Sequence, residues 1–233
     1  MMKTLTIIIP ALNEEKSIGA VIDEIPIDKL KKIGYETEIL IVDNGSTDNT
    51  KNIALSRGAT VIEHHIRGYG SAYKAGFACA TSDIIATGDA DLTYPFVDLP
   101  TIIQKFEADN YEFLNTNRLS TLDSSAMSKS HIFGNRLLTM MLKKLFSSPF
   151  EDSQSGMWVF KRYILDDLDL NSSGMSFSQE LKLEAFSKGF RCGEVTIDYR
   201  ARIGKAKLNP IRDSVGNITH LFKKRLKTYK KRK

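Results

Sequence analysis

Two aspartates stand two residues apart in the sequence Gly88-Asp89-Ala90-Asp91, directly after a short apolar run. Side chains two residues apart on an extended chain point the same way, so the two carboxylates can meet on one side. Close carboxylates repel one another, and a divalent cation removes that conflict by binding both. Mg²⁺ takes one or two carboxylates and completes its shell with water and substrate phosphates. The sequence therefore predicts a Mg²⁺ or Mn²⁺ site at Asp89 and Asp91, although Asp-x-Asp alone also fits a solvated turn.

A third acidic residue, Asp43, follows an earlier apolar run and is followed by Asn44-Gly45-Ser46. A carboxylate in this position can accept hydrogen bonds from a nucleobase or a ribose. An ordinary turn in which Asp43 binds its own backbone is the alternative. Further on, the stretch from Arg67 to Gly70 precedes a helical pattern, and a helix N-terminus favours anions. A tight turn explains the glycines of this stretch nearly as well, and the third glycine of a dinucleotide-binding motif is missing.

The elements that must position these residues can be predicted from the apolar pattern. Four short runs rich in β-branched residues are separated by helical patterns, at 5–9, 38–42, 59–63 and 84–87. Nearly continuous apolar runs of this length are typical of parallel strands covered on both faces. In such sheets ligands bind at the carboxyl ends of the strands, where Asp43 and Asp89 stand. The sequence therefore predicts an α/β fold with a mostly parallel central sheet and helices on both faces.

The second half of the chain has a less regular pattern. Its apolar spacing predicts helices at 96–108, 133–146 and 179–188 and strands at 112–115, 157–161 and 194–199. Residues 119–130 are polar and rich in serine, which predicts a loop.

Composition and charge limit the class of protein. The 233 residues are 42% hydrophobic and 26% charged, which is typical of a globular protein, and the net charge is +5. Eight basic residues fall in 223–233, so the remainder carries 25 Lys and Arg against 28 Asp and Glu, about −3. This distribution argues against a uniformly basic surface, so we expect no nucleic-acid partner. Two cysteines with no disulfide or zinc spacing fit a reducing, cytoplasmic setting, and we find no stretch long enough to span a bilayer.

The basic C-terminus has a helical pattern of its own. Apolar residues recur every three or four positions, at Ile211, Val215, Ile218, Phe222, Leu226 and Tyr229. We therefore expect a domain at 1–210 followed by an amphipathic basic helix at 211–233. Such a helix can lie on an anionic membrane surface with its apolar face at the headgroup boundary. The alternative, that this face packs on the body of the protein, is equally compatible with the sequence.

Together these segments resemble the family 2 inverting glycosyltransferases of the GT-A fold. Residues 8–15 (IIPALNEE) are similar to the IPAYNEE start of that family, and residues 41–48 (IVDNGSTD) resemble its VDDGSTD loop, with Asn44 in place of the second Asp. Asp89-Ala90-Asp91 stands where the family has its metal-binding DxD sequence. Residues 68–73, 152–156 and 202–208 are also similar to segments of the dolichyl-phosphate mannose and glucose synthases, with Ala206 replacing the usual Ser.

The resemblance implies roles for particular residues. It implies nucleotide-sugar contacts at Pro10, Ala11, Glu14, Asp43, Gly70, Asp89 and Ala90, and metal contacts at Asp89, Asp91 and Thr93. Arg118 and Lys207 would hold phosphate groups, and Arg202 with Lys207 would neutralise the leaving group beside the metal at Asp91. At the place of the arginine that holds the acceptor phosphate in such proteins, this chain has His131 or Lys129.

The implied function is transfer of a sugar, with inversion, from GDP-mannose, UDP-glucose or UDP-N-acetylglucosamine to dolichyl or polyprenyl phosphate. A lipid phosphate is already an anion at pH 7 and requires cations rather than a strong base. A family 2 enzyme with a soluble or glycan hydroxyl acceptor is the alternative, and it would need a general base, for which Asp152 and Glu180 are the candidates. In either case we expect an enzyme, and with the lipid acceptor a peripheral one on the cytoplasmic face of the membrane. A membrane-binding or nucleic-acid-binding module that functions through its tail alone is a rival from another class.

Overall fold

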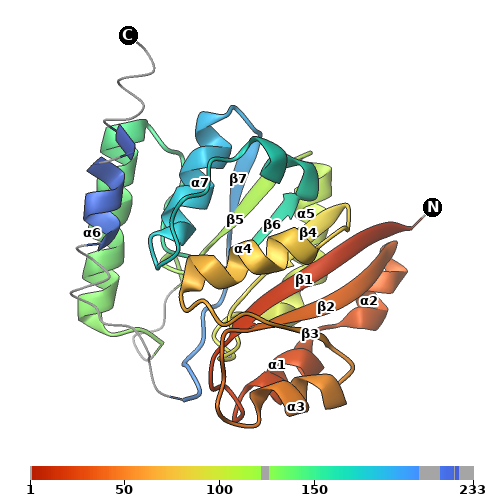
Figure 1. The fold of residues 1–233 in the computed structure, drawn as a ribbon. Coiled ribbons are helices and arrows are strands. Elements are labelled where there is room, and N and C mark those ends of the chain that lie inside the picture. The colour runs from red at the N-terminus through yellow and green to blue at the C-terminus, as the bar shows by residue number, and fades with distance from the viewer. Residues whose placement is uncertain (1, 122–125, 205–215, 223, 226–233) are drawn as a thin grey trace.

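The computed structural model describes residues 2–121, 126–204, 216–222, 224 and 225. They form one central sheet with helices packed on it (Figure 1). In chain order the strands and helices are β1 (Lys3–Ala11), α1 (Ile18–Glu24), α2 (Ile27–Lys32), β2 (Tyr35–Asp43), α3 (Thr50–Ser56), β3 (Thr60–Glu63), α4 (Tyr69–Cys79), β4 (Ile84–Thr87), the 3₁₀ helix η1 (Phe96–Asp98), α5 (Leu99–Ala108), β5 (Phe113–Asn117), α6 (Lys129–Phe146), β6 (Trp158–Lys161), the 3₁₀ helix η2 (Arg162–Asp167), α7 (Phe177–Ser187) and β7 (Cys192–Thr196).

The sheet has seven strands in the order β3-β2-β1-β4-β6-β5-β7. The first four strands of the chain pair in parallel, as the continuous apolar runs predicted. β6 runs antiparallel to both of its neighbours, β4 and β5, while β7 is parallel to β5. The mostly parallel α/β sheet predicted from the sequence is therefore confirmed, with a single antiparallel strand between its two parallel parts.

Each face of the sheet has its own apolar core. Along β1, Leu5, Ile7 and Ile9 pack into the core beneath α1, α2, α3 and α5, whereas Ile8 packs into the core beneath α4 and α7. This alternation follows from the two-residue period of a strand. Because both faces are covered, polar groups on this part of the sheet are accessible mainly at the strand ends. The site described below lies at such an edge.

α6 stands apart from the sheet and packs less of itself against the body (Figure 1). Its fully or nearly buried residues are Leu138, Thr139 and Leu142. The helix begins at Lys129, four residues before the predicted start, because the Ser128 hydroxyl caps it by accepting a hydrogen bond from the backbone N–H of His131. Among the described residues, no helix is both long and apolar enough to cross a membrane.

Of the predicted C-terminal helix, residues 216–222, 224 and 225 are described, and all are helical. They lie beside α6 (Figure 1). Two members of the predicted apolar face are among them. Phe222 is exposed, at 49%, whereas Ile218 is partly buried. Leu221, which is fully buried, belongs to the side that packs on the body. The described part of the predicted apolar face is therefore only partly covered by the body, and the choice between docking and a membrane surface stays a prediction. The other residues of 211–233 lie outside the described part of the chain.

Candidate active site

Three neighbouring strands bring the candidate residues to one edge of the sheet. Ala11 at the end of β1 pairs with Asp43 at the end of β2, and β4 runs parallel on the other side of β1. The chain leaves β4 at Thr87 and enters the segment that carries Asp89 and Asp91. The carboxyl ends of these strands therefore place Asp43 and the Asp89–Asp91 pair at the edge where ligands of parallel sheets bind.

Asp91 is almost completely buried, and both of its carboxylate oxygens are hydrogen-bonded. Oδ1 accepts from the hydroxyl of Thr93 at 2.6 Å and from its backbone N–H at 3.1 Å. Oδ2 accepts from the guanidinium of Arg202, at 2.7 Å from Nε and 2.6 Å from Nη2. The backbone of the same segment is bound as well, since Ile203 N–H donates to the carbonyl of Asp91. Thr93 and Arg202, predicted for this site from far-separated motifs, therefore meet at Asp91.

Asp89 lies half-buried beside this pair. Burial raises the pKa of its carboxyl group to about 7, and the negative charge of Asp91 adds to that rise, while Arg202 and Arg118 oppose it. When burial and a second carboxylate both disfavour ionisation of a carboxyl group, an additional positive charge nearby stabilises its ionised form. This is an electrostatic setting in which a divalent cation would stabilise the ionised form.

The candidate residues share a cleft of about 340 Å³. Its lining includes Tyr69, Asp89, Asp91, Thr93, Tyr94, Arg118, His131, Gln154, Tyr199, Arg202 and Asn217. All three predicted metal ligands and the predicted cations Arg118 and Arg202 are in this set, and so is His131. The tyrosines, Gln154 and Asn217 were not predicted as site residues. Tyr69 and Tyr94 stand within motifs that the sequence contains, but Asn217 reaches the cleft only through the docking of the C-terminal helix.

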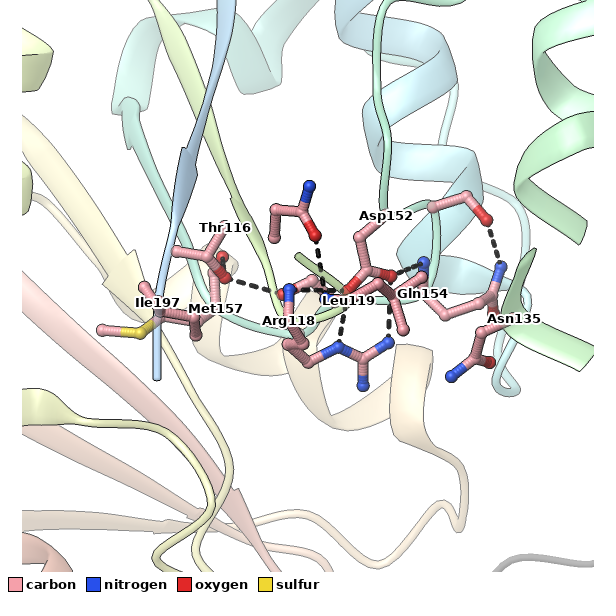
Figure 2. A network of polar contacts seen from close by, with 12 residues as sticks. Thr116, Arg118, Leu119, Asn135, Asp152, Gln154, Met157 and Ile197 are labelled. Atoms are coloured by element: carbon pink, nitrogen blue, oxygen red, sulfur yellow. Dashed lines mark hydrogen bonds and ion pairs between the residues drawn. The ribbon is translucent and has the colours of Figure 1, made fainter. Parts of the chain in front are cut away.

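Arg118 is held by Asp152, as Figure 2 shows. Its Nε and Nη2 donate to the two carboxylate oxygens of Asp152 at 2.7 and 3.0 Å, and its guanidinium lies 5.2 Å from the ring of Tyr199. Although burial opposes ionisation of Asp152, the charge and hydrogen bonds of Arg118 outweigh it and lower the pKa of the carboxyl group. Asp152 is completely buried and also accepts from the backbone N–H of Gln154. A carboxylate bound in this way orients Arg118 and is poorly suited to take a proton from an acceptor hydroxyl.

Glu180, the other candidate base, is occupied elsewhere. Its Oε2 accepts from the backbone N–H groups of Asn171 and Ser172, at 3.1 and 2.7 Å. Its Oε1 receives His220 and Lys224 from the C-terminal helix, at 3.1 and 3.3 Å. Burial opposes ionisation, but the hydrogen bonds from His220 and Ser172 and the charge of Lys224 prevail and lower its pKa to about 2. The structure thus gives Glu180 a structural role in holding the C-terminal helix. Glu180 is not among the residues that line the cleft.

Lys182 of α7 supports the segment that carries Asp152. The side chain is fully buried, and its Nζ donates to the carbonyls of Ser153 and Ser155 at 3.1 and 2.6 Å and to the hydroxyl of Ser178 at 2.8 Å. The following residue, Gly156, lies close to the Tyr69 hydroxyl and to Asp89. A side chain at position 156 would collide with Tyr69. The sequence analysis missed Lys182, because a lysine within a helix gives no local signal of burial.

The predicted nucleotide-binding residues Pro10, Ala11 and Asp43 lie at the same edge, outside the lining of the cleft. Asp43 Oδ1 accepts from the backbone N–H of Ser46 at 3.0 Å, so the ordinary turn expected as an alternative does form. Asn44, which stands where the family has Asp, donates to the carbonyls of His64 and Ile66. A carboxylate could not make these two bonds, which explains the amide at this position.

Gly70 and Glu14 are placed differently from one another. A side chain on Gly70 would come within 2.6 Å of Phe177 Cβ and 2.7 Å of the Ser172 carbonyl, so helix packing by itself requires glycine there. Glu14 is half-buried, and its charge contributes to raising the pKa of Asp89. Lys207 lies outside the described residues. The nucleotide contacts of these residues remain predictions.

The donor set at Asp89 and Asp91 fits a hard divalent cation, because carboxylate oxygens are the ligands such ions prefer. In the part of the chain that the structure describes, no three acidic, histidine or cysteine side chains cluster tightly enough to hold a metal without other ligands. Two carboxylates with further ligands from a bound diphosphate are the arrangement expected for Mg²⁺ or Mn²⁺. The ion would supply positive charge to the diphosphate when bound.

A mostly parallel sheet with paired carboxylates at its carboxyl edge is the architecture of GT-A glycosyltransferases, and solved structures agree. The chain superposes on glucosyl-3-phosphoglycerate synthase from Mycobacterium tuberculosis in complex with UDP with a TM-score of 0.77 and 21% identity, covering 96% of this chain and 80% of that one. At this identity the likeness establishes the fold alone.

Sequence comparison identifies the family. Residues 6–169 match Glycosyl transferase family 2. The chain is 35% identical over 221 residues to the low-salt glycan biosynthesis hexosyltransferase Agl6 of Haloferax volcanii, covering 94% of this chain and 53% of that protein, about half its length. It is 31% identical to a dolichyl-phosphate hexose transferase of the same organism, covering 88% of this chain and 87% of that one. The chain belongs to glycosyltransferase family 2 and is an enzyme of that class, which confirms the fold and family expected from the sequence.

Proposed function

We propose that this enzyme transfers a hexose from a nucleotide sugar to a polyprenyl or dolichyl phosphate with inversion at the anomeric carbon. The observation that carries the proposal is the cleft in which the Asp89–Asp91 pair meets Arg118 and Arg202, while both candidate bases are bound elsewhere. A phosphate acceptor needs no base, so this arrangement suits it better than a hydroxyl acceptor. GDP-mannose, UDP-glucose and UDP-N-acetylglucosamine are the candidate donors.

Relatives support the acceptor class. One is named for transfer of a hexose to dolichyl phosphate. Another, an undecaprenyl-phosphate 4-deoxy-4-formamido-L-arabinose transferase from Pectobacterium carotovorum, is 29% identical over 172 residues and covers 70% of this chain and 50% of that protein. A solved structural neighbour contains Mn²⁺ together with UDP, which supports Mn²⁺ or Mg²⁺ as the metal here.

Within the chain, Asp89 and Asp91 would hold the metal with help from Thr93. Arg202 already lies at Asp91 and would place its positive charge beside the diphosphate as the leaving group departs. Arg118 would hold the acceptor phosphate, since its pair with Asp152 uses Nε and Nη2 and not Nη1. His131 lines the same cleft and is a second candidate for that phosphate, whereas Lys129 does not line it.

The same proposal places the enzyme at the cytoplasmic face of a membrane, as a peripheral protein. Its catalytic domain would comprise residues 1–210, and the basic segment 211–233 would contact anionic lipid. Polyprenyl phosphates reside in membranes, so an enzyme that uses them gains from attachment there. The clustering of eight basic residues in 223–233 supports this placement.

The test is to incubate the purified enzyme with Mn²⁺, vesicles containing polyprenyl phosphate, and one radiolabelled donor at a time. Label that moves into the organic phase identifies the donor and the lipid acceptor together. Label that stays in water-soluble or protein products with every donor would contradict the lipid acceptor and favour a hydroxyl acceptor. Asp91→Asn serves as the inactive control, because it removes a carboxylate charge at the proposed metal.

A further inference from the structure

α6 has two faces with different surroundings. Its inner face lines the cleft, with His131, Asn135 and Leu138. Its outer face is a stripe of exposed residues at helical spacing, namely Lys129, Phe133, Arg136, Met140 and Lys144. Phe133 is 71% exposed and Met140 46%, so the outer stripe alternates cations with large apolar side chains. Large apolar side chains exposed together on one helix face indicate a surface that binds a partner.

The described part of the C-terminal helix continues this surface. The guanidinium of Arg225 lies 5.9 Å from the ring of Phe146 at the end of α6, and the two helices lie side by side in Figure 1. The helix is attached through the side that carries Leu221, where Lys224 also bonds Glu184 at 2.7 Å and His220 bonds Glu180. Phe222 is left 49% exposed by this mode of docking.

The charge of α6 and of the C-terminal sequence selects the partner. α6 contains four basic residues and no acidic one, and residues 214–233 contain eight basic residues and no acidic one. A second copy of the chain would bring these like charges together, which is unfavourable. Nucleic acid would use the cations but would leave the phenylalanine and methionine side chains in water. An anionic bilayer accepts both, because cations bind its headgroups and apolar side chains enter the headgroup boundary.

We propose that the outer stripe of α6 together with Phe222 forms a two-helix surface that binds anionic membranes. This surface consists of residues other than the basic ones beyond 225. It deepens the proposed function, on which its biological meaning rests. Because the inner face of α6 lines the cleft, the bilayer would lie one helix away from Asp89, Arg118 and Arg202. An acceptor phosphate in the headgroup layer would then have a short path to the reacting groups.

The test uses Phe133→Ser/Met140→Ser and a matched control, Ile66→Ser/Leu55→Ser, whose residues are 68% and 47% exposed on other parts of the surface. Binding is measured by flotation with vesicles of phosphatidylcholine alone or mixed with phosphatidylglycerol. We expect the α6 variant to bind the mixed vesicles about tenfold more weakly and the control to bind like the wild type. An Arg136→Gln/Lys144→Gln variant should lose about fivefold for each cation, and should lose it only with the anionic vesicles.

Equal vesicle binding by the wild type and the α6 variant would overturn the surface assignment, as would an equal loss in the control. A wild-type dimer in light scattering that the α6 variant converts to monomer, with vesicle binding unchanged, would assign the surface to a second copy instead. Thermal unfolding verifies that each variant is folded. Transfer to a short-chain prenyl phosphate in solution separates the two proposals, because it requires chemistry but no membrane. If no prenyl phosphate is glycosylated while vesicle binding follows the prediction, the proposed function fails and the surface assignment stands.

Discussion

Asp91 joins the two halves of the active-site edge. Its carboxylate accepts hydrogen bonds from Thr93, two residues away, and from Arg202, which is 111 residues away in the sequence. Arg202 provides the positive charge that a nearly buried carboxylate requires. In the proposed function, the same guanidinium would offset negative charge on a departing diphosphate.

Replacing Asp91 with Asn should abolish transfer while preserving the fold. The substitution keeps the size of the side chain and removes the charge proposed to bind the metal, so we expect kcat to fall by about 10²–10³-fold or more. Mn²⁺ binding measured by electron paramagnetic resonance should weaken in parallel. Asp98→Asn is the matched control, because Asp98 is exposed and makes no side-chain capping bond to α5. Undiminished transfer by the Asp91 variant would show that the metal assignment is wrong.

Lys182 gives a pH-dependent prediction. Burial, with a smaller effect of Arg118, lowers its pKa to about 7 although the charge of Asp152 opposes the shift. Between pH 7 and the ordinary value of 10.5, the unfolded chain binds a proton that the folded chain does not, so raising the pH favours folding. The free energy of unfolding of the wild type should therefore increase relative to Lys182→Met, by at most about 1.4 kcal/mol per pH unit. Urea unfolding of both proteins across this range measures the difference, and parallel curves would contradict the lowered pKa.

At the scale of elements, α7 is the link between the cleft and the C-terminal helix. Residues 177–185 are all buried, including Glu180, Lys182 and Glu184. Lys182 points its amine at the segment 153–155, whereas Glu180 and Glu184 bind the C-terminal helix. Gln179 extends the link by donating to the carbonyl of Asn217 at 2.7 Å. One helix therefore fixes both the support of Arg118 and the position of a cleft-lining asparagine.

Replacing Glu180 with Gln should loosen the docked C-terminal helix. The change removes the charge that attracts Lys224 and His220, and we expect the free energy of local opening to fall by about 2 kcal/mol. Hydrogen exchange at residues 217–222 should become faster, while exchange in β1 stays unchanged as the internal control. Acid should act in the same way. A carboxyl group whose pKa is lowered in the folded protein stabilises the fold fully at pH values above its ordinary pKa of 4.5, and that stabilisation is lost as the pH falls toward 2. Unchanged exchange in the variant and in acid would contradict the role of Glu180.

At the scale of the whole molecule, the net charge of +5 divides into about −3 for residues 1–222 and +8 for residues 223–233. The acidic body contains the carboxylates of the active-site edge. Near the start of the basic end, Lys224 forms ion pairs with Glu180 and Glu184 of this body. Under the proposed function, this division would separate metal and nucleotide binding from attraction to an anionic surface.

Removing residues 226–233, which include five of the basic residues, should weaken binding to anionic vesicles without changing transfer to a short-chain acceptor in solution. Each Lys or Arg near such a surface contributes about 1 kcal/mol, and salt screens the attraction. The wild type should therefore lose vesicle binding as ionic strength rises, and the shortened chain should show a smaller salt dependence. Equal salt dependence in the two proteins would assign the attraction to α6 and the body instead.

The elements were predictable where one physical pattern dominated. Strands β1, β2 and β4 are continuous apolar runs because both of their faces are covered, and burial of that kind is visible in sequence. The Asp89–Asp91 pair was predictable because it follows such a strand at the edge where ligands bind. The family motifs then extended the prediction to Thr93, Arg118 and Arg202, all of which line the cleft.

The sequence by itself therefore determined the parallel α/β fold, the family, and the acidic pair at the strand ends, because each depends on neighbouring residues or on motifs in series. The tertiary structure decided which charges meet. The pairs Arg118–Asp152 and Arg202–Asp91 join residues 34 and 111 positions apart, and the burial of Lys182 and Glu180 depends on segments packed against α7. It also decided which side of the C-terminal helix docks, since Lys224 and His220 pair with carboxylates on α7 and Leu221 is fully buried. Local spacing contains no information about such partners, since the free energy of a charge is set by whatever the fold brings beside it.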